Sequence, residues 1–404
     1  MRVWGGSKMK KTVLVNMVMA MAVLIIAGCS ETKKIETPGV TDTQILIGTS
    51  CALGGYASFL GTQYTHGALA LIIDINDKGG IHGRKINLIF YDDQYDPAKC
   101  VANTQKLIGE DRVFMLFNYV GTPTSVKIID IVNKAEVPAF GFLTGAEALR
   151  TPFRPYMFHV RDSYYGEAEG AISYFVDKLG LKKIAVMYQE DAFGLAVLEG
   201  VQQALKRRNM ETVATATFPR GTTNVENALK IIKGSGADAV VMVGTYTPLA
   251  RFVNISHKAG FTPYFHTVSF VGSEVYGKEL VEVYKVASSQ YDKIIVTQVV
   301  PSPFDDSFPT VRHYRELIAK HFPHDQPNYV ALEGFVNALV LSKILEACGK
   351  ELTREKFVIT LESIRNMDIG IGMAVTYGPL DHRGLEGIYY SKLTKDGTFR
   401  IFRP

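Results

Sequence analysis

From residue 44 onward the sequence alternates between short apolar runs and longer amphipathic stretches, and this alternation constrains the fold more than any other feature. The runs QILIGTS and KINLIFYDD indicate buried strands, and the stretch between them, QYTHGALALIIDINDKGG, has the apolar spacing of a helix that ends at a glycine. Strands that alternate with helices of this length form βαβ units, in which helices cover both faces of a parallel sheet. The first part of the chain therefore predicts an α/β lobe.

The same alternation begins again near residue 156 and continues to about residue 300. Two such series without a short helical repeat indicate a duplicated α/β fold rather than a solenoid. Two long helical patterns then follow at 309–322 and 329–349, and short strand patterns end the chain. A chain that returns to helices after its second sheet is expected to cross back to the first lobe, and the terminal strands could join either lobe.

The N-terminus carries the pattern of an export signal. Met9–Lys11 precede the apolar run TVLVNMVMAMAVLIIAGC, which is short for a membrane-spanning helix and ends in small residues. Residues 26–29, IAGC, resemble the lipobox of bacterial lipoproteins, and the resemblance implies cleavage before Cys29 and a lipid on that residue. We therefore predict a lipoprotein signal peptide at 1–28, a tether at 29–42 and anchoring to the periplasmic or outer face of a bacterial membrane. An ordinary signal peptide is the alternative.

Three further cysteines lie in the exported part of the chain. Cys51 follows the first predicted strand, and Cys100 lies in the helix that follows the second. Neighbouring parallel strands end at the same edge of a sheet, and an exported protein meets oxidising conditions. We therefore predict a Cys51–Cys100 disulfide, with two free thiols as the alternative, and a buried thiol at Cys348.

Composition and motifs argue against several function classes. The 404 residues are 47% hydrophobic, the net charge is only +4, and the basic residues are scattered, so we expect no nucleic-acid partner. The sequence contains no G-x-S-x-G, H-E-x-x-H, Walker or C-x-x-C motif. We therefore expect no enzyme, no cofactor and no metal site.

Loops rich in small, hydroxyl and aromatic residues follow the predicted strands of both series. They are SCALGGYASFLG, NYVGTPTS and FLTGAE in the first lobe and QEDAFG, GTYTP and VSFVGSE in the second. Ligands bind at such strand ends in open α/β sheets, and helix N-termini there can hold an anion without lysine or arginine. The two sets of loops therefore predict a ligand pocket in a cleft between two lobes.

These loops, together with INDKGGIHGRKINLIFYDDQYDPAKCVANTQKLI and IAVMYQEDAFG, resemble the substrate-binding proteins of ABC transporters of the leucine/isoleucine/valine-binding type. The resemblance covers residues 43–403. It implies a type I periplasmic binding protein or Venus-flytrap fold, in which two Rossmann-like lobes with parallel sheets are joined by three crossovers. The crossovers would lie near Arg161, Val300 and Met373.

The resemblance also implies a division of the chain and a role. We predict that lobe 1 comprises 43–160 plus 302–370 and that lobe 2 comprises 161–301 plus 371–404. The expected function is capture of a small molecule and its delivery to an ABC permease, by a monomer without chemistry of its own. A module that senses the ligand for a partner receptor is the alternative, because it would use the same residues.

The resemblance places the family's ligand contacts on residues of both lobes: Leu60, Gly121, Leu143, Thr144, Gly145, Phe193, Tyr246 and Phe270. Rings and hydroxyl groups of the same loops add further candidates: Tyr56, Phe59, Tyr119, Thr122 and Phe142. Structural roles, as a turn glycine or as core aromatics, remain open for Gly121, Phe193 and Phe270.

Two departures from the family pattern bear on the ligand. Gly121 stands where amino-acid binders have a serine for the α-carboxylate, and Phe270 stands where they have an acidic residue for the α-ammonium. A buried ammonium without a partner is costly. We therefore predict a small carboxylate or amide with an apolar or aromatic body. A branched-chain or other amino acid is the alternative, and Glu274 or Glu333 would then reach the pocket.

Overall fold

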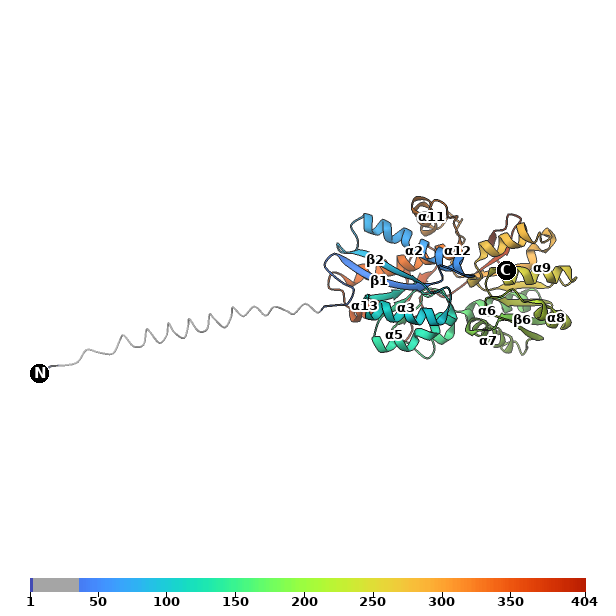
Figure 1. Cartoon of the computed structure of the whole chain (residues 1–404), viewed down its shortest axis with the longest axis horizontal. Helices are drawn as coiled ribbons and strands as arrows, with labels where there is room; N and C mark the ends of the chain where they lie inside the picture. The colour runs from blue at the N-terminus through green and yellow to red at the C-terminus, as the bar shows by residue number, and fades with distance from the viewer. Residues whose placement is uncertain (3–35) are drawn as a thin grey trace. The chain divides into compact units, whose positions relative to one another are not determined.

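The computed structural model describes residues 1–2 and 36–404, and the chain divides into two units, Met1–Glu36 and Thr37–Pro404. The second unit carries the whole fold described below (Figure 1). The predicted signal peptide and its lipidation site at Cys29 lie outside the described residues. Within the described part of the chain, no helix combines the length and apolarity needed to cross a bilayer.

The first sheet is parallel throughout, with the strand order β2-β1-β3-β4-β5. The strand order changes direction between β1 and β3, which are neighbours in the sheet although β2 lies between them in the sequence. Ligands bind at such a reversal in doubly wound sheets. The strands are β1 (Gln44–Cys51), β2 (Lys85–Asp92), β3 (Met115–Phe117), β4 (Ala139–Phe140) and β5 (Met157–Phe158).

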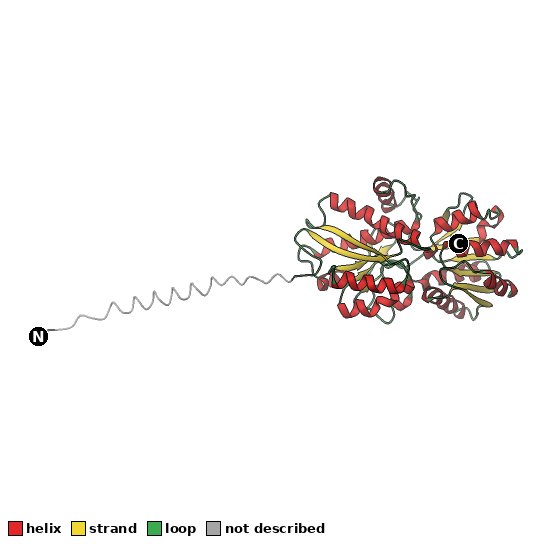
Figure 2. Ribbon diagram, viewed as in Figure 1, coloured by secondary structure: helices red, strands yellow, loops and turns green. Residues whose placement is uncertain are grey.

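Helices cover both faces of this sheet (Figures 1 and 2). The long helices α2 (Ser58–Asp77) and α12 (Tyr329–Cys348) pack against each other on one face, and α3 (Pro97–Gly109) and α5 (Ile129–Ala135) lie on the other. The C-terminal helices therefore return to the first lobe, as the sequence predicts. The remaining helices of this lobe are α4 (Thr122–Ser125), α11 (Pro309–His321) and α13 (Arg354–Glu362).

The second sheet has the order β14-β13-β10-β9-β8-β6-β7, and its five parallel strands repeat the order of the first sheet. It differs from a purely parallel sheet because β13 pairs antiparallel with both β10 and β14. The hairpin of β13 and β14 turns at Asp396-Gly397, where Gly397 has a positive φ of 77°. The strands are β6 (Ile184–Gln189), β7 (Ala214–Phe218), β8 (Ala239–Val243), β9 (Tyr264–Thr267), β10 (Ile294–Gln298), β13 (Tyr389–Leu393) and β14 (Phe399–Phe402).

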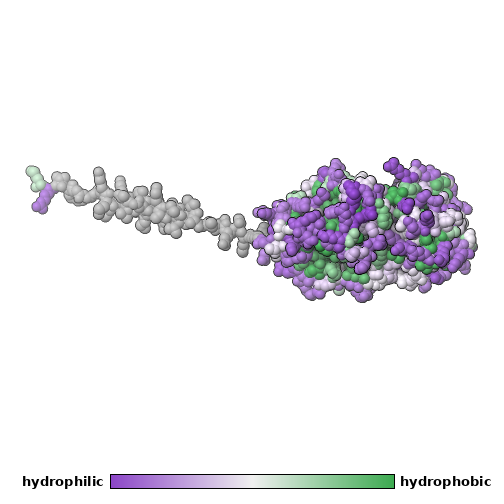
Figure 3. Space-filling view, turned by 90° about the horizontal axis from the view of Figure 1, so that it is seen from above, coloured by the Kyte–Doolittle hydropathy of each residue, from purple (hydrophilic) through white to green (hydrophobic). Residues whose placement is uncertain are grey.

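The second lobe has its own helices, and three crossovers connect it to the first. The crossovers span 159–163, 299–308 and 376–388. The third follows a small ladder of β11 (Met367–Asp368) and β12 (Ala374–Val375). The face in Figure 3 is mostly hydrophilic, with apolar residues in separate groups. The helices are α6 (Tyr164–Ile172), α7 (Ala192–Lys206), α8 (Glu226–Gly234), α9 (Tyr246–Lys258) and α10 (Ser273–Lys278).

The predicted Cys51–Cys100 disulfide is wrong, because the two thiols are free and lie on opposite faces of the first sheet. The Cys51 Sγ atom is 3.5 Å from the Thr65 hydroxyl of α2, whereas Cys100 belongs to α3 on the other face. The strand ends are adjacent, as expected, but adjacent ends do not place side chains on the same face. Cys348 is a buried free thiol, as predicted.

Candidate functional site

Two aspartates at the end of β2 organise the loops of lobe 1. The Asp92 carboxylate accepts hydrogen bonds from the backbone N–H groups of Leu53 (2.9 Å) and Gly54 (3.1 Å), which ties the loop after β1 to β2. The Asp93 carboxylate accepts from the Ser50 hydroxyl (2.8 Å) and the Tyr95 N–H (2.8 Å). Burial raises the pKa of the Asp93 carboxyl to about 6, although these hydrogen bonds oppose the rise. Both carboxylates therefore hold loops in place.

Tyr95 packs directly on Gly121. Gly121 has a φ of 92°, and a Cβ atom there would lie 2.0 Å from Cε2 of the Tyr95 ring. No other residue type than glycine combines this backbone conformation with this approach. The departure from serine at this position therefore has a physical cause, because the space of a serine side chain is filled by the tyrosine ring.

Four buried rings meet where the two lobes contact each other, a region that we call the cleft, and we call these rings the aromatic cluster: Tyr95, Tyr164, Phe193 and Phe270. Ring centroids are 6.0 Å apart for Tyr95 and Phe270, 4.7 Å for Phe270 and Phe193, and 5.3 Å for Phe193 and Tyr164. Each ring is at most 1% exposed. The cluster forms an apolar wall that includes the position where relatives are expected to carry an acidic residue.

Polar contacts beside this cluster join the lobes directly. Tyr246 of α9 donates its hydroxyl to the backbone carbonyl of Tyr56 at 2.8 Å, and its ring packs edge-on against Phe59 at 6.2 Å. Arg220, after β7, donates Nε to the Tyr56 hydroxyl at 3.0 Å and Nη2 to the Tyr95 carbonyl. Its guanidinium lies 4.5 Å from the Tyr95 ring centroid. Arg220 therefore connects lobe 2 to two loops of lobe 1.

Several hydrogen-bonding groups next to the aromatic cluster have no hydrogen-bond partner among the described residues. They are the hydroxyl groups of Tyr95 and Tyr164 and the Nε and Nη1 atoms of Arg161. Thr122 and Thr144 hydrogen-bond each other at 2.7 Å nearby, and the Tyr164 N–H donates to the Gly145 carbonyl at 2.7 Å. Burial raises the pKa of the Tyr164 phenol to about 12, so it is a neutral donor at physiological pH.

Arg161 also anchors a buried ion cluster at the first crossover. Its Nη2 atom lies 2.8 Å from Glu167, and its Nη1 atom lies 3.5 Å from Glu333 of α12. Glu167 is saturated, because it also accepts from the Ser269 N–H (2.7 Å) and the Thr297 hydroxyl (2.7 Å). Glu333 is not fully hydrogen-bonded, because its Oε1 atom accepts no hydrogen bond from a described residue. Burial raises the pKa of the Glu333 carboxyl to about 7, although the charge of Arg161 opposes the rise.

Most of the residues predicted from the sequence lie in or beside this cleft. Leu60 contributes a side chain that would be 3.1 Å from a Cβ atom at Gly272, which places it at the boundary with lobe 2. Leu143 acts through its backbone, because its N–H donates to the Tyr119 carbonyl and its carbonyl accepts from Gly121. Contacts with one another or with the aromatic cluster bring together Tyr56, Phe59, Leu60, Gly121, Thr122, Leu143, Thr144, Gly145, Phe193, Tyr246 and Phe270.

Tyr119 and Phe142 are placed elsewhere, and the prediction for these two residues is corrected. Both belong to a separate core cluster together with Cys100 of α3. The Tyr119 hydroxyl is already 2.9 Å from the Thr104 hydroxyl of that helix, and its ring centroid is 6.3 Å from that of Phe142. A hydroxyl at a strand end can therefore serve a packed core when the covering helix offers a partner.

Four residues of the cleft were not predicted as ligand contacts: Tyr95, Arg161, Tyr164 and Arg220. Each follows a strand, and this placement was the available signal. Tyr95 lies next to two aspartates and a helix start, a pattern typical of a structural turn. Arg161 and Tyr164 belong to a crossover, whose side chains a sequence pattern does not assign to a cleft.

Comparisons with known proteins find a matching family and several similar proteins. The family profile described as "Periplasmic binding protein" matches residues 44–398. An amino acid binding protein of Pseudomonas aeruginosa is 25% identical over 259 residues, which cover 64% of this chain and 67% of that protein. The Leu/Ile/Val-binding protein of Citrobacter freundii is 24% identical, covering 70% and 73%.

A solved structure is also similar over nearly the whole described fold. The crystal structure of a possible leucine/isoleucine/valine-binding protein from Rhodopirellula baltica aligns with a TM-score of 0.83 and 30% identity, covering 90% of this chain and 97% of that one. These comparisons confirm the resemblance and the two-lobed fold predicted from the sequence.

Proposed function

The chain belongs to the periplasmic binding protein family, and on this premise we propose that it captures a small carboxylate or amide between its lobes and delivers it to an ABC permease. The family consists of solute-binding proteins, so the chain is not an enzyme. We further propose that a lipid on Cys29 anchors the protein outside the cytoplasm, since residues 26–29 resemble a lipobox. Mass spectrometry of the N-terminal peptide from native membranes tests the anchor, and an unmodified Cys29 would refute it.

One observation supports the ligand class above all. Two buried phenol hydroxyls, on Tyr95 and Tyr164, and the Nε atom of Arg161 have no hydrogen-bond partner among the described residues and lie beside an apolar wall, whereas Nη1 of Arg161 faces Glu333 at 3.5 Å. A hydroxyl or N–H donor that is buried without an acceptor costs free energy. A carboxylate or amide oxygen would satisfy such donors, and an apolar or aromatic body would pack on Phe193 and Phe270.

An amino acid is the second candidate, and Glu333 favours it. The unsatisfied Oε1 atom of Glu333 is the kind of acceptor that an ammonium needs, and it lies 3.5 Å from Arg161, next to the same cleft. The Citrobacter freundii relative is named for leucine, isoleucine and valine. Against this candidate, Glu333 already neutralises part of the Arg161 charge, and the position expected to hold the ammonium is the apolar Phe270.

Calorimetric titration distinguishes the two candidates. The purified protein would be titrated with leucine, valine, and matched aliphatic and aromatic carboxylic acids and amides that lack the amino group. We expect binding by an acid or amide and no heat from leucine. Submicromolar leucine binding without any response to amine-free compounds would overturn the ligand class, and Glu333→Gln should then abolish leucine binding.

Transport and sensing require a different experiment. Membrane vesicles that contain the permease and are loaded with ATP would be incubated with this protein and its radiolabelled ligand on the outside. ATP-dependent uptake that needs both proteins supports delivery, whereas uptake independent of this protein would leave the sensing role as the better proposal.

A further inference from the structure

The charge of Arg161 is shared between two carboxyl groups, one from each lobe. Its Nη2 atom lies 2.8 Å from Glu167 of lobe 2, and its Nη1 atom lies 3.5 Å from Glu333 of lobe 1. All three side chains are at most 7% exposed. A ligand beside Arg161 therefore meets a guanidinium whose positive charge is already matched by buried carboxyl groups.

Arg150 is a second cation near Glu333, but it does not leave positive charge in excess. The charges of Arg150 and Arg161 both favour the ionised form of Glu333. Two further carboxyl groups, on Glu147 and Asp162, face Arg150 in turn. Two guanidinium groups thus face four carboxyl groups in this part of the fold.

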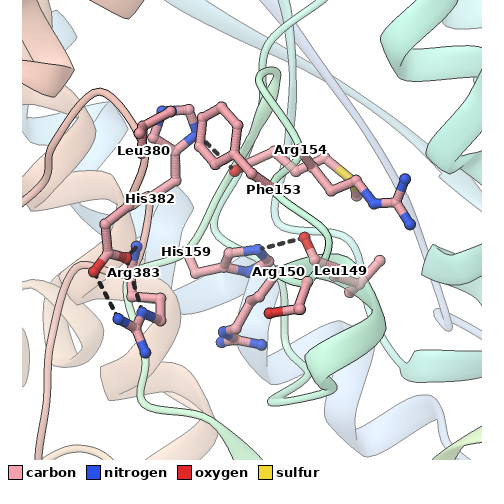
Figure 4. Close-up of a pocket in the computed structure, with 11 residues that line it drawn as sticks. Leu149, Arg150, Phe153, Arg154, His159, Leu380, His382 and Arg383 are labelled. Atoms are coloured by element: carbon pink, nitrogen blue, oxygen red, sulfur yellow. Dashed lines mark hydrogen bonds and ion pairs between the residues drawn. The ribbon is translucent and has the colours of Figure 1, made fainter.

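The pocket beside the crossovers adds no net charge to this group (Figure 4). In Figure 4 Arg150 lies beside the His159 ring, whereas the guanidinium of Arg383 is joined to Asp381. Asp381 accepts from Nε (2.8 Å) and Nη2 (2.7 Å) of Arg383, so these two charges cancel each other. The excess of carboxyl groups around Arg150 and Arg161 therefore remains.

Of the two carboxyl groups on Arg161, Glu333 can hold a proton at the lower cost. Glu167 also accepts from the Ser269 N–H (2.7 Å), the Ser269 hydroxyl (2.9 Å) and the Thr297 hydroxyl (2.7 Å), and such donors stabilise a carboxylate. The Oε1 atom of Glu333 accepts no hydrogen bond from a described residue. Its pKa of about 7 means that roughly half of the ligand-free molecules carry this proton at pH 7.

The Tyr64 phenol of α2 also faces Glu333, and it does not compete for this proton. Burial holds the pKa of the Tyr64 phenol well above its usual value, so the phenol is neutral. Its hydroxyl donates to the Gly141 carbonyl at 3.0 Å. The titration of this group near neutral pH is therefore assigned to Glu333.

A carboxylate ligand would add one more negative charge beside Arg161. Its proposed donors are the neutral hydroxyls of Tyr95 and Tyr164 and the Nε atom of Arg161. The Arg161 guanidinium carbon is 5.5 Å from the Tyr164 ring centroid, so the ligand and Glu333 would share this guanidinium. Carboxylates this close in a buried site repel each other, and a proton on one of them removes the repulsion.

We infer that the cleft takes up its carboxylate ligand together with one proton, which Glu333 holds while the ligand is bound. The proton comes from the solvent, and it leaves the net charge around Arg161 unchanged on binding. The inference rests on the proposed function, because it concerns the same ligand in the same cleft. An acid should take up a proton, a neutral amide should take up none, and leucine, whose ammonium needs an ionised Glu333, should release one.

Calorimetric titration of the full-length protein tests these signs. The probes are 4-methylpentanoate and 4-methylpentanamide, which have the carbon skeleton of leucine, leucine itself, and the aromatic acid 3-phenylpropanoate. Phosphate and Tris buffers differ in their heat of ionisation, so the difference in binding heat gives the protons exchanged per ligand. We expect an acid to take up about half a proton at pH 7 and to bind about tenfold more weakly at pH 8 than at pH 6, although the acid is ionised at both.

Failure of this inference and failure of the proposed function give different results. Binding of an acid without proton uptake, or with equal affinity at pH 6 and pH 8, would overturn the inference and leave the proposed function intact. Binding of leucine with no response to any amine-free compound at either pH would overturn the proposed ligand class, and the inference with it.

Glu333→Gln locates the proton. We expect proton uptake to disappear and the affinity for the acid at pH 8 to rise at least about fivefold above that of the wild type. Glu274→Gln is the matched control, because burial also raises the pKa of Glu274 to about 7 but its neighbouring charge is Lys278 and not Arg161. Uptake that Glu274→Gln abolishes and Glu333→Gln retains would overturn the assignment. Circular dichroism checks folding, and if Glu333→Gln does not fold, the pH dependence of the wild type decides.

Discussion

At the scale of single residues, the shape of the cleft depends on which side chain fills the volume next to a glycine. The Tyr95 ring occupies the volume that a side chain at position 121 would need. The ring is held there by the Asp93 carboxylate, which fixes the Tyr95 backbone in a positive-φ conformation of 63°. The shape of the pocket is therefore set by a pair of residues, Tyr95 and Gly121, from two different loops.

Gly121→Ala tests this pairing. The added Cβ would clash with the Tyr95 ring, and the backbone conformation would be strained as well. Gly349→Ala is a matched control, because Gly349 also has a positive φ, 72°, but no atom lies within 4 Å of its added Cβ. In urea unfolding we expect Gly121→Ala to lower the free energy of unfolding by at least about 1 kcal/mol more than Gly349→Ala does. Equal losses would mean that the ring moves away without cost.

Glu274 gives a pH dependence that can be assigned to one carboxyl group. Its Oε1 atom accepts from the Tyr329 N–H at 2.8 Å, and burial of its unpartnered Oε2 atom raises its pKa to about 7. The folded state therefore holds this proton more tightly than the unfolded state, whose pKa is near the usual 4.5. The resulting stabilisation is complete below about pH 4.5 and is lost as the pH rises through about 7.

Glu274→Gln should remove the loss of stability at high pH, because an amide does not titrate in this range. The amide oxygen can still accept the hydrogen bond from the Tyr329 N–H. We expect the variant to match the wild type at pH 4.5 and to exceed it by roughly 1–3 kcal/mol in free energy of unfolding at pH 8. Glu282→Gln, an exposed position on the same lobe, is the control. A difference between Glu274→Gln and wild type that stays constant from pH 4.5 to 8 would show that Glu274 does not titrate in this range.

At the scale of elements, the contact between α2 and α12 shows how the C-terminal helices are held on lobe 1. A Cβ atom at Gly67 of α2 would lie 1.8 Å from the Ala331 carbonyl oxygen, and one at Gly334 of α12 would lie 2.1 Å from the Tyr64 carbonyl oxygen. Both clashes involve backbone atoms, which cannot move without shifting a whole helix. The two glycines therefore allow the helices to pack at backbone contact, and the N-terminus of α12 reaches the cleft.

Gly334→Ala should separate these helices. We expect a loss of roughly 1–3 kcal/mol in free energy of unfolding, because overpacking outweighs the higher helix propensity of alanine. Gly234→Ala in α8 is the matched control, since no atom lies within 4 Å of its added Cβ. It should be neutral or slightly stabilising. Denaturant unfolding of both variants measures the difference, and a stabilising Gly334→Ala would contradict the close helix contact.

At the scale of the whole fold, closure of two lobes about three crossovers is the motion expected of this architecture. Contacts made by Arg220 and Tyr246 hold the lobes together in the structure, and both reach the loop that carries Tyr56. Small-angle scattering with and without ligand should show a smaller radius of gyration in the bound state. An unchanged radius at saturating ligand would count against hinge closure.

Arg220→Met should shift the protein toward the open form. The variant loses the hydrogen bonds to Tyr56 and Tyr95, the stacking on the Tyr95 ring and the ion pair with Asp191 of its own lobe at 3.3 Å. We expect a larger radius of gyration without ligand and roughly tenfold weaker ligand binding, as the loss of one or two charge-assisted hydrogen bonds implies. Arg251→Met is the control, because Arg251 pairs with Glu226 within lobe 2. The same scattering and affinity for both variants would argue against a role of Arg220 in closure.

The sequence by itself determined the two α/β lobes, the strand-end loops and the positions where helices begin. These features follow from short-range chemistry: apolar periodicity sets strands and helices, and Asp96 and Asp191 cap the helices that start beside them. The return of the C-terminal helices to lobe 1 also followed from the order of these patterns.

Only the tertiary structure decided which of the loop residues face the cleft. Cys51 and Cys100 ended on opposite faces of one sheet, and Tyr119 turned its hydroxyl to Thr104 in the core. Tyr95 and Arg161 entered the cleft because their partners, Asp93 and Glu167, hold them there. The physical reason is that periodicity fixes how side chains alternate along one element. Which helix, ring or charge packs against each face of that element depends on residues far away in the chain.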